Sequence, residues 1–308
     1  MFRRREIWAL IAVQFLFASN AVVGRLALAT FTPRAILVLR ICGAASVFWA
    51  FGFRSALRER FTGREVRTLL LCAVLGLVLN QGFYLLGLSL STATNATIIG
   101  TSIPVFTAAI SMAVGDERLV LGKILGLALA LSGALTLAGI DRLLTASADH
   151  RAAASLGDLF FVANSLSFSA YFVLVRKLAR RHDALAISRW TFAFAALLSL
   201  PLAFLGPLTH AATSSLAWAE AVYLVLGPTV LAYLFNAYAL RFVDSSTAAS
   251  FVYLQPVIAA AMALPLLGER PGARTGLGAL LIFSGVLLGS SSDWRARRAL
   301  LAVAADPG

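Results

Sequence analysis

Long apolar runs follow one another along almost the whole of this sequence. Of its 308 residues, 60% are hydrophobic and only 13% are charged, whereas a soluble domain carries about 25% charged residues. The runs have the ~20 residues that a helix needs to cross the hydrocarbon of a bilayer. They lack the strict alternation that marks the strands of a membrane barrel. The sequence therefore predicts an all-α membrane protein.

Hydropathy divides the chain into ten predicted transmembrane helices. They are 8–28, 35–53, 68–88, 95–114, 121–140, 156–175, 184–205, 219–240, 247–267 and 275–291. The first run resembles a secretory signal, because Arg3, Arg4 and Arg5 precede it. Its length and the presence of Asn20 and Arg25 favour its retention as the first helix.

The basic residues indicate how the chain crosses the membrane. The net charge is +12, from 26 Lys and Arg against 14 Asp and Glu, and cytoplasmic loops carry such an excess. With the amino terminus inside, 18 basic residues lie at inner ends and 6 at outer ends, while Arg40 and Arg189 lie within spans. Both termini are therefore expected in the cytoplasm. Nucleic-acid binding is not expected, because the basic residues are spread over six inner ends.

The two halves of the chain repeat each other. A shift of 149 residues places Arg40 on Arg189, and a shift of 152 residues matches six further positions. The six pairs are Ala96 and Ala248, Pro104 and Pro256, Glu117 and Glu269, Arg118 and Arg270, Gly126 and Gly278, and Gly133 and Gly285. Five helices in each half force the second copy to be inverted. The loop charges agree, because the five-Arg connection after the second helix corresponds to 206–218, which has no Lys or Arg.

This duplication predicts the domain organisation. A first five-helix repeat at 1–144 is followed by a linker at 145–155, a second, inverted repeat at 156–294 and a cytoplasmic tail at 295–308. Cys42 and Cys72 both lie in apolar stretches, so no disulfide framework or CxxC metal pair is expected. Neither a metal nor a cofactor is expected.

Two five-helix halves, each with Pro in the fourth helix, Glu thirteen residues later and a Gly-rich fifth helix, resemble the EamA family of the drug/metabolite transporter superfamily. The matching residues are Pro104, Glu117, Gly126 and Gly133, and again Pro256, Glu269, Gly278 and Gly285. The resemblance covers nearly the whole chain. It implies a ten-helix carrier of a bacterial-type inner membrane, often an exporter of amino acids or other metabolites. No motif separates the YddG-type exporters of aromatic amino acids from other subgroups.

Uncharged polar and aromatic side chains lie near the middle of several predicted helices. Lipid cannot satisfy amides, so these groups must face protein or a water-filled cavity. They either form interhelical hydrogen bonds, worth about 0.6 kcal/mol on average, or line a central pocket. The candidate substrate-binding residues are Asn20, Asn80, Gln81, Tyr84, Thr101, Ser102, Asn164, Ser167, Tyr171, Trp190, Tyr233, Asn236, Tyr253 and Gln255.

Two arginines and two prolines are further candidates. Arg40 and Arg189 lie about one turn inside their helices, where they either snorkel toward headgroups or bind a substrate carboxylate and gate each mouth. Pro104 and Pro256 lie near the middle of their helices, where proline removes a backbone hydrogen bond and kinks the helix. They are candidate hinges for alternating access.

These features predict a transporter and not an enzyme. The expected cargo is a small organic metabolite, most of all a neutral or aromatic amino acid, exported through the uncharged central pocket. No carboxylate lies at the midplane, which weighs against obligatory proton coupling. Glu117 and Glu269 either couple protons, or they anchor loops or pair with Arg118 and Arg270. The alternatives are an exporter of lipophilic cations and a lipid-modifying membrane enzyme. The expected partners are the substrate and the bilayer, with the chain a monomer or a weak homodimer.

Overall fold

The computed structural model describes residues 4–51, 59–91, 93–117, 120–138, 151–258 and 276–289. In these ranges the regular secondary structure is helical, apart from an isolated β-bridge between Phe31 and Thr209. The helical segments that are long and apolar enough to cross a membrane are Arg5–Ala27, Pro33–Ala50, Gly63–Leu90, Leu156–Ala179, Ala184–Phe204 and Ser215–Leu240. The all-α membrane fold is thus confirmed. The total of ten crossings and the cytoplasmic termini stay predictions.

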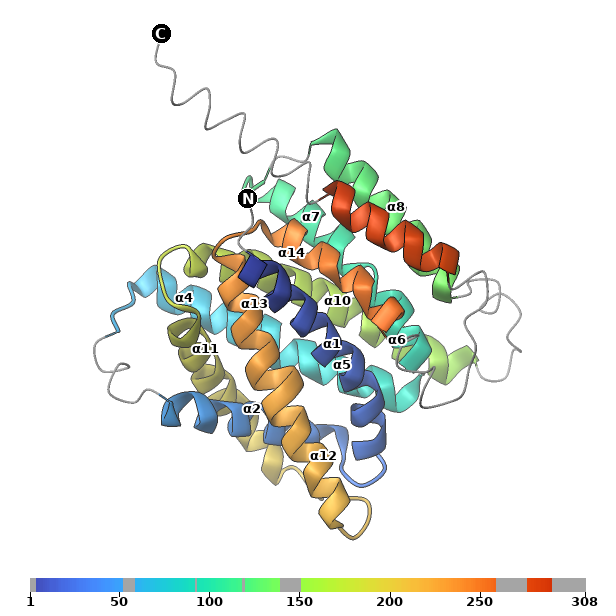
Figure 1. Cartoon of the computed structure of the whole chain (residues 1–308). Helices are drawn as coiled ribbons and strands as arrows, with labels where there is room; N and C mark the ends of the chain where they lie inside the picture. The colour runs from blue at the N-terminus through green and yellow to red at the C-terminus, as the bar shows by residue number, and fades with distance from the viewer. Residues whose placement is uncertain are drawn as a thin grey trace.

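Local capping signals explain where helices of the first half begin. The Thr32 hydroxyl accepts a hydrogen bond from the Ala35 backbone N–H, and Pro33 follows as the first helical residue. Thr62 and Glu65 form a capping box. The elements of this half are α1 (Arg4–Ala27), α2 (Pro33–Ala50), α4 (Gly63–Leu71), η1 (Cys72–Leu79), α5 (Asn80–Leu90), α6 (Ala93–Gly100), α7 (Ile103–Ala113) and α8 (Leu121–Ala138) (Figure 1).

The second half repeats this order. Its elements are α10 (Arg151–Ala179), α11 (Ala184–Ser199), η3 (Leu200–Phe204), α12 (Ser215–Val225), η4 (Leu226–Leu231), α13 (Ala232–Leu240), α14 (Ser245–Ser250) and η5 (Phe251–Tyr253). A helical turn at 254–258 and a helix at 276–289 follow. Because α10 begins at Arg151, residues 151–155 of the predicted linker are helical. The rest of that linker and the tail at 295–308 lie outside the described residues.

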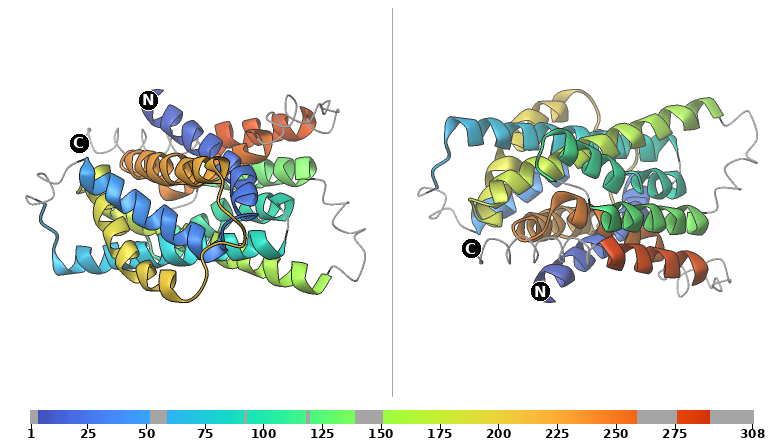
Figure 2. Two further views of the ribbon diagram at one scale, coloured as in Figure 1. Left: turned by 90° about the horizontal axis from the view of Figure 1, so that it is seen from below. Right: turned by 90° about the horizontal axis from the view of Figure 1, so that it is seen from above.

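The helix boundaries follow the predicted repeat. α5 begins at Asn80 and α13 at Ala232, while α6 begins at Ala93 and α14 at Ser245, so that each pair differs by 152 residues. The packing is reciprocal as well. α10 packs against α5 as α1 packs against α13, and α2 packs on α11 as α7 does on α14 (Figure 2). Two halves related by a pseudo-two-fold axis make such contacts.

The fourth span of each half is interrupted near its proline. α6 ends at Gly100, Thr101 and Ser102 form a turn, and Pro104 is the second residue of α7. In the second half, α14 passes into the 3-10 turn η5 shortly before Pro256. Pro104 therefore lies at the start of a helix and not in the middle of one, because the proline ring and its missing N–H are tolerated in a first helical turn.

The third span of each half contains a π-helical segment, η1 in one and η4 in the other. Pro228 lies within η4 and lacks the N–H that a regular helix would use, which explains the wider turn. Two hydrogen bonds mark these segments. The Thr229 hydroxyl donates to the Leu224 carbonyl at 2.6 Å, and the Tyr233 hydroxyl donates to the Gly76 carbonyl at 2.9 Å.

The last helix of each half packs closely on the other. α8 and the helix at 276–289 lie side by side in Figures 1 and 2. A Cβ atom added to Gly126 would lie 2.6 Å from the Gly289 nitrogen and 2.7 Å from the Gly285 carbonyl oxygen. Glycine therefore lets the two backbones approach, as small residues do between membrane helices.

Candidate functional site

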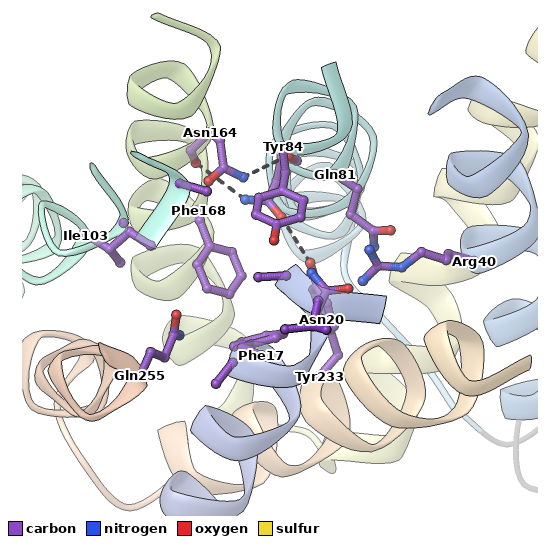
Figure 3. Close-up of a pocket in the computed structure, with 16 residues that line it drawn as sticks. Phe17, Asn20, Arg40, Gln81, Tyr84, Ile103, Asn164, Phe168, Tyr233 and Gln255 are labelled. Atoms are coloured by element: carbon purple, nitrogen blue, oxygen red, sulfur yellow. Dashed lines mark hydrogen bonds between the residues drawn. The ribbon is translucent and has the colours of Figure 1, made fainter. Parts of the chain in front are cut away.

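A cavity of about 380 Å³ lies between helices of both halves (Figure 3). Its volume is within the range of sites for small molecules. Residues of α1, α2, α5, α6, α7, α10 and α13, together with the turn at 254–258, form its wall. The predicted site residues on this wall are Asn20, Arg40, Asn80, Gln81, Tyr84, Asn164, Tyr233 and Gln255. The structure thus brings together residues from both halves, more than 200 positions apart in the sequence.

The other predicted site residues do not line this cavity; they are Thr101, Ser102, Ser167, Tyr171, Arg189, Trp190, Asn236 and Tyr253. Ser102 and Ser167 donate to the Ile99 and Leu75 carbonyls at 2.7 and 2.6 Å. Tyr171 is buried behind the wall, with its ring stacked on Phe168 at 5.6 Å. Thr101, Asn236 and Tyr253 are buried in the helix bundle.

Amides on the cavity wall also hold helices together. The Asn164 side chain donates to the Asn80 carbonyl at 2.8 Å, and the Asn80 side chain donates to the Asn164 carbonyl at 3.4 Å. The Tyr233 hydroxyl shares its single proton between the Gly76 carbonyl at 2.9 Å and Oδ1 of Asn80 at 3.2 Å. This network connects α5 with α10 and α13 across the two halves. Both expected roles, interhelical bonding and cavity lining, therefore occur in the same side chains.

Two other amides have unused hydrogen-bonding atoms. Both Nε2 and Oε1 of Gln81, and Oδ1 of Asn20, are buried without a partner in the described part of the chain. Leaving such an atom unsatisfied costs about 1–3 kcal/mol. In Figure 3 the Gln81 side chain extends toward the Arg40 guanidinium. A polar ligand in the cavity would find donors and acceptors here.

Arg40 places one positive charge on the described wall of the cavity, so the prediction of an uncharged pocket is wrong. Only 3% of its surface is exposed, so it does not snorkel toward headgroups. Its Nε donates to the Thr229 hydroxyl at 2.8 Å, so the π-helical segment η4 positions it. Neither Asp nor Glu occurs among the residues that line the cavity. Because a buried charge without an opposite partner is costly, this guanidinium favours an anionic group of a ligand.

Arg189, which a shift of 149 residues matches with Arg40 in the sequence, has a different environment. It is completely buried, which again contradicts snorkelling. Its Nη1 donates to Oε1 of Glu59 and its Nε donates to the Phe48 carbonyl at 3.3 Å. The neighbouring Trp190 indole donates to Oε2 of Glu59 at 2.8 Å. Arg189 and Trp190 therefore hold a carboxylate of the chain itself, away from the cavity.

A buried cluster of charges lies toward the end of the molecule where α1 begins. Arg176 of α10 lies 2.6 Å from Asp116 and 3.6 Å from Glu117, and also pairs with Asp244. Lys123 lies 3.2 Å from Glu117. Among the described residues Glu117 therefore pairs with Lys123 and Arg176. Arg118, Glu269 and Arg270 lie outside the described residues, so the pairs predicted with Arg118 and Arg270 stay predictions. The cluster links both halves.

Sequence reasoning missed several residues that contribute to these sites. Phe17 and Phe168 line the cavity with their rings 5.8 Å apart, but nothing distinguishes them among 21 phenylalanines. Thr229 was missed although Pro228 inside a predicted helix is a signal for an irregular turn. Glu59 gives no signal, because its carboxylate meets Arg189 only after the chain has folded.

The sequence profile of a known family matches this chain twice. The profile described as "EamA-like transporter family" covers residues 4–139 and 155–291, which correspond to the two halves of the fold. A solved structure titled "Crystal structure of protein" has a TM-score of 0.74 at 20% identity, covering 94% of this chain and 99% of that one. This likeness shows the same fold.

Several curated relatives are named as transporters. An "Uncharacterized transporter" of Archaeoglobus fulgidus is 28% identical over 79% of this chain and 81% of its own. A "Probable terminal-alkyne amino-acid exporter" of Streptantibioticus cattleyicolor is 24% identical over 92% and 93%. An "S-adenosylmethionine uptake transporter" of Rickettsia felis is 25% identical over 65% and 64%.

Proposed function

This chain belongs to the EamA-like transporter family, and from that membership we propose that it exports a small carboxylate-bearing metabolite, most of all a neutral or aromatic amino acid. That the chain is a multi-pass membrane transporter follows from the family and from its apolar helices. Our proposal adds the identity of the cargo, the outward direction of transport and the location in a bacterial-type inner membrane. The cavity around Arg40 is the proposed binding site.

The observation that carries the proposal is the environment of Arg40. Its guanidinium is buried on the cavity wall, and no carboxylate lines that cavity in the described residues. The planar fork of an arginine fits a carboxylate through two parallel hydrogen bonds. A cargo carboxylate would therefore supply the charge that the cavity lacks.

The remaining wall suits the rest of an amino acid. Oε1 of Gln81 and Oδ1 of Asn20 are buried acceptors without a donor, and an ammonium group offers three donors. Phe17, Phe168 and Tyr84 present aromatic rings to the same cavity. Offset and edge-to-face ring contacts are favourable, so an aromatic body would be accepted beside the charged groups.

A lipophilic cation fits this cavity less well. Arg40 would repel it, and the described lining offers no carboxylate to offset that repulsion. One relative is named as a probable amino-acid exporter, which agrees with the proposed cargo, and another is named as an S-adenosylmethionine uptake transporter. Those two relatives differ in direction, so flux has to be measured both ways.

Flux in liposomes tests the carboxylate site. We expect saturable transport of phenylalanine and much weaker transport of phenylalaninamide, which has the same ring and ammonium group but no carboxylate. Arg40→Gln should lower phenylalanine transport about 10- to 100-fold, as expected for the loss of a charged hydrogen bond worth about 1.5–3 kcal/mol. It should also remove the preference for phenylalanine over phenylalaninamide.

Arg241→Gln is the matched control, because Arg241 is half-exposed and lies away from the cavity. It should leave both the flux and the preference unchanged. An Arg40→Gln protein that kept the wild-type preference for the acid would refute the site. Flux of other metabolites without any amino-acid transport would refute the cargo.

A further inference from the structure

Arg189 and Trp190 bind one carboxylate with two separate donors. The guanidinium Nη1 donates to Oε1 of Glu59, and the indole Nε1 donates to Oε2 of the same group at 2.8 Å. The guanidinium is completely buried and Glu59 is mostly so. Each oxygen of the carboxylate therefore has its own donor, which is the arrangement of a built carboxylate site.

Three aromatic rings pack around the Trp190 indole of this site. The Trp190 ring lies 5.5 Å from Trp49, 6.2 Å from Phe61 and 6.1 Å from Phe194, measured between centroids. These rings come from α2, from α11 and from the segment before α4. The surroundings thus combine a cationic group with aromatic walls, as the Arg40 cavity does with Phe17 and Phe168.

The two arginines lie in the second helix of each half but not at equivalent positions, because Arg40 is residue 8 of α2 and Arg189 is residue 6 of α11. Arg189 corresponds to Arg40 under the 149-residue shift. Phe48, whose carbonyl accepts a hydrogen bond from Arg189, lies eight residues after Arg40 in α2, or about 12 Å along the helix axis. Arg40 faces an open cavity, while the guanidinium of Arg189 is already bound to the Glu59 carboxylate.

We propose that Arg189 and Trp190 form a second carboxylate site of this transporter, which takes the carboxylate of an aromatic or apolar acid when Glu59 withdraws. In transporters built from inverted repeats, one half rocks against the other as access alternates. Glu59 belongs to the first half and Arg189 to the second, so such a movement would separate them. The cargo assignment rests on the proposed function, since both sites would take the same class of acid.

The buried charge of Arg189 explains why Glu59 and an acid would exchange. A buried guanidinium that loses its partner is strongly destabilised, so Glu59 is displaced most readily when another carboxylate replaces it. Glu59 is in this sense an internal substitute for cargo. Its carboxylate reports which chemical group the site accepts.

Chemical rescue tests this site separately from the Arg40 cavity. All proteins carry Arg40→Gln, so that the first site does not respond, and the full chain is purified in detergent. The thermal midpoints of R40Q, R40Q/E59A and R40Q/E59A/R189Q are measured with phenylacetate and with phenylacetamide. Phenylacetate should raise the midpoint of R40Q/E59A by several degrees more than that of R40Q, and phenylacetamide should not.

The triple variant should not respond to phenylacetate, because the guanidinium has been removed. Equal responses of R40Q and R40Q/E59A would overturn the proposal. If R40Q/E59A folds only when phenylacetate is present during purification, that result supports the site. If R40Q/E59A and R40Q/E59Q both fail to fold, with and without phenylacetate, the result counts against the site. Arg40 is replaced in every protein of this experiment. The response to phenylacetate therefore tests the Arg189 site even if Arg40 turns out not to bind cargo.

Discussion

Asp116 and Arg176, which belong to different halves of the chain, form a buried ion pair with a distance of 2.6 Å. Arg176 lies eight residues after the cavity residue Phe168 in α10, or about 12 Å along the helix. The pair therefore joins the halves at one end of the molecule, beyond the cavity. Glu117 and Asp244 add further contacts to Arg176 there.

Arg176→Gln should destabilise the protein by about 3–5 kcal/mol, because it leaves buried carboxylates without their partner. The measurement is the thermal midpoint in detergent. Arg180→Gln is the control, since Arg180 is half-exposed and lies 3.5 Å from the same Asp116; exposed pairs contribute about 0–1 kcal/mol. Equal midpoints for the two variants would show that the buried cluster does not hold the halves together.

Pro104→Ala combined with Pro256→Ala should slow transport and leave cargo binding intact. Alanine restores the missing backbone N–H and favours a continuous helix across each interruption, which would stiffen the segments proposed to bend. Flux in liposomes and equilibrium binding of the cargo measure the two effects. Pro33→Ala is the control, because Pro33 is the first residue of α2, where a proline removes no hydrogen bond of the helix. Full flux in the double variant would rule out the hinges.

Gly126→Val should destabilise the contact between α8 and the helix at 276–289. An added Cβ would lie 2.6–2.8 Å from backbone atoms of Gly285 and Gly289, and overpacking of this kind costs about 1–3 kcal/mol. Gly82→Ala is the control, since its added Cβ meets no atom within 4 Å. The thermal midpoint of the first variant should fall and that of the second should not. A normal midpoint for Gly126→Val would mean that the helices separate at little cost.

Transport should continue without an imposed pH gradient. No carboxylate lines the cavity in the described residues, and Glu117 is engaged by Lys123, Arg176 and Ser246. Flux into liposomes with equal pH on both sides measures this. Glu117→Gln should reduce the thermal midpoint without creating or removing a gradient dependence. Flux that appears only with a gradient would instead assign proton coupling to a carboxylate outside the cavity.

Much of the fold could be predicted because its signals are local. The apolar runs are continuous stretches of sequence and the repeat is a comparison between such stretches, and the described helical spans begin within five residues of their predicted starts. The predicted linker shows the limit. Hydropathy starts the sixth span at residue 156, but α10 starts at Arg151, because a polar first turn can be helical outside the apolar core of the bilayer.

Which polar residues face the cavity depends on packing. The Gln81 amide lies on the wall, while Ser167 bonds to the Leu75 carbonyl and Tyr171 lies behind the wall. All three have similar polar character at similar predicted depth. Their positions differ because the rotation of each helix and the π-helical turns set the direction of each side chain. The rotation and the turns both depend on contacts between helices that are distant in the sequence.

The sequence by itself determined that this protein spans a membrane, that it is built from two related halves and that polar groups lie at membrane depth, since hydropathy and repetition are properties of short segments. Only the tertiary structure decided that Arg40 faces a cavity without a carboxylate while Arg189 holds Glu59, 130 residues away. The physical reason is that a buried charge is defined by its neighbours, and neighbours from distant segments are assigned by helix packing.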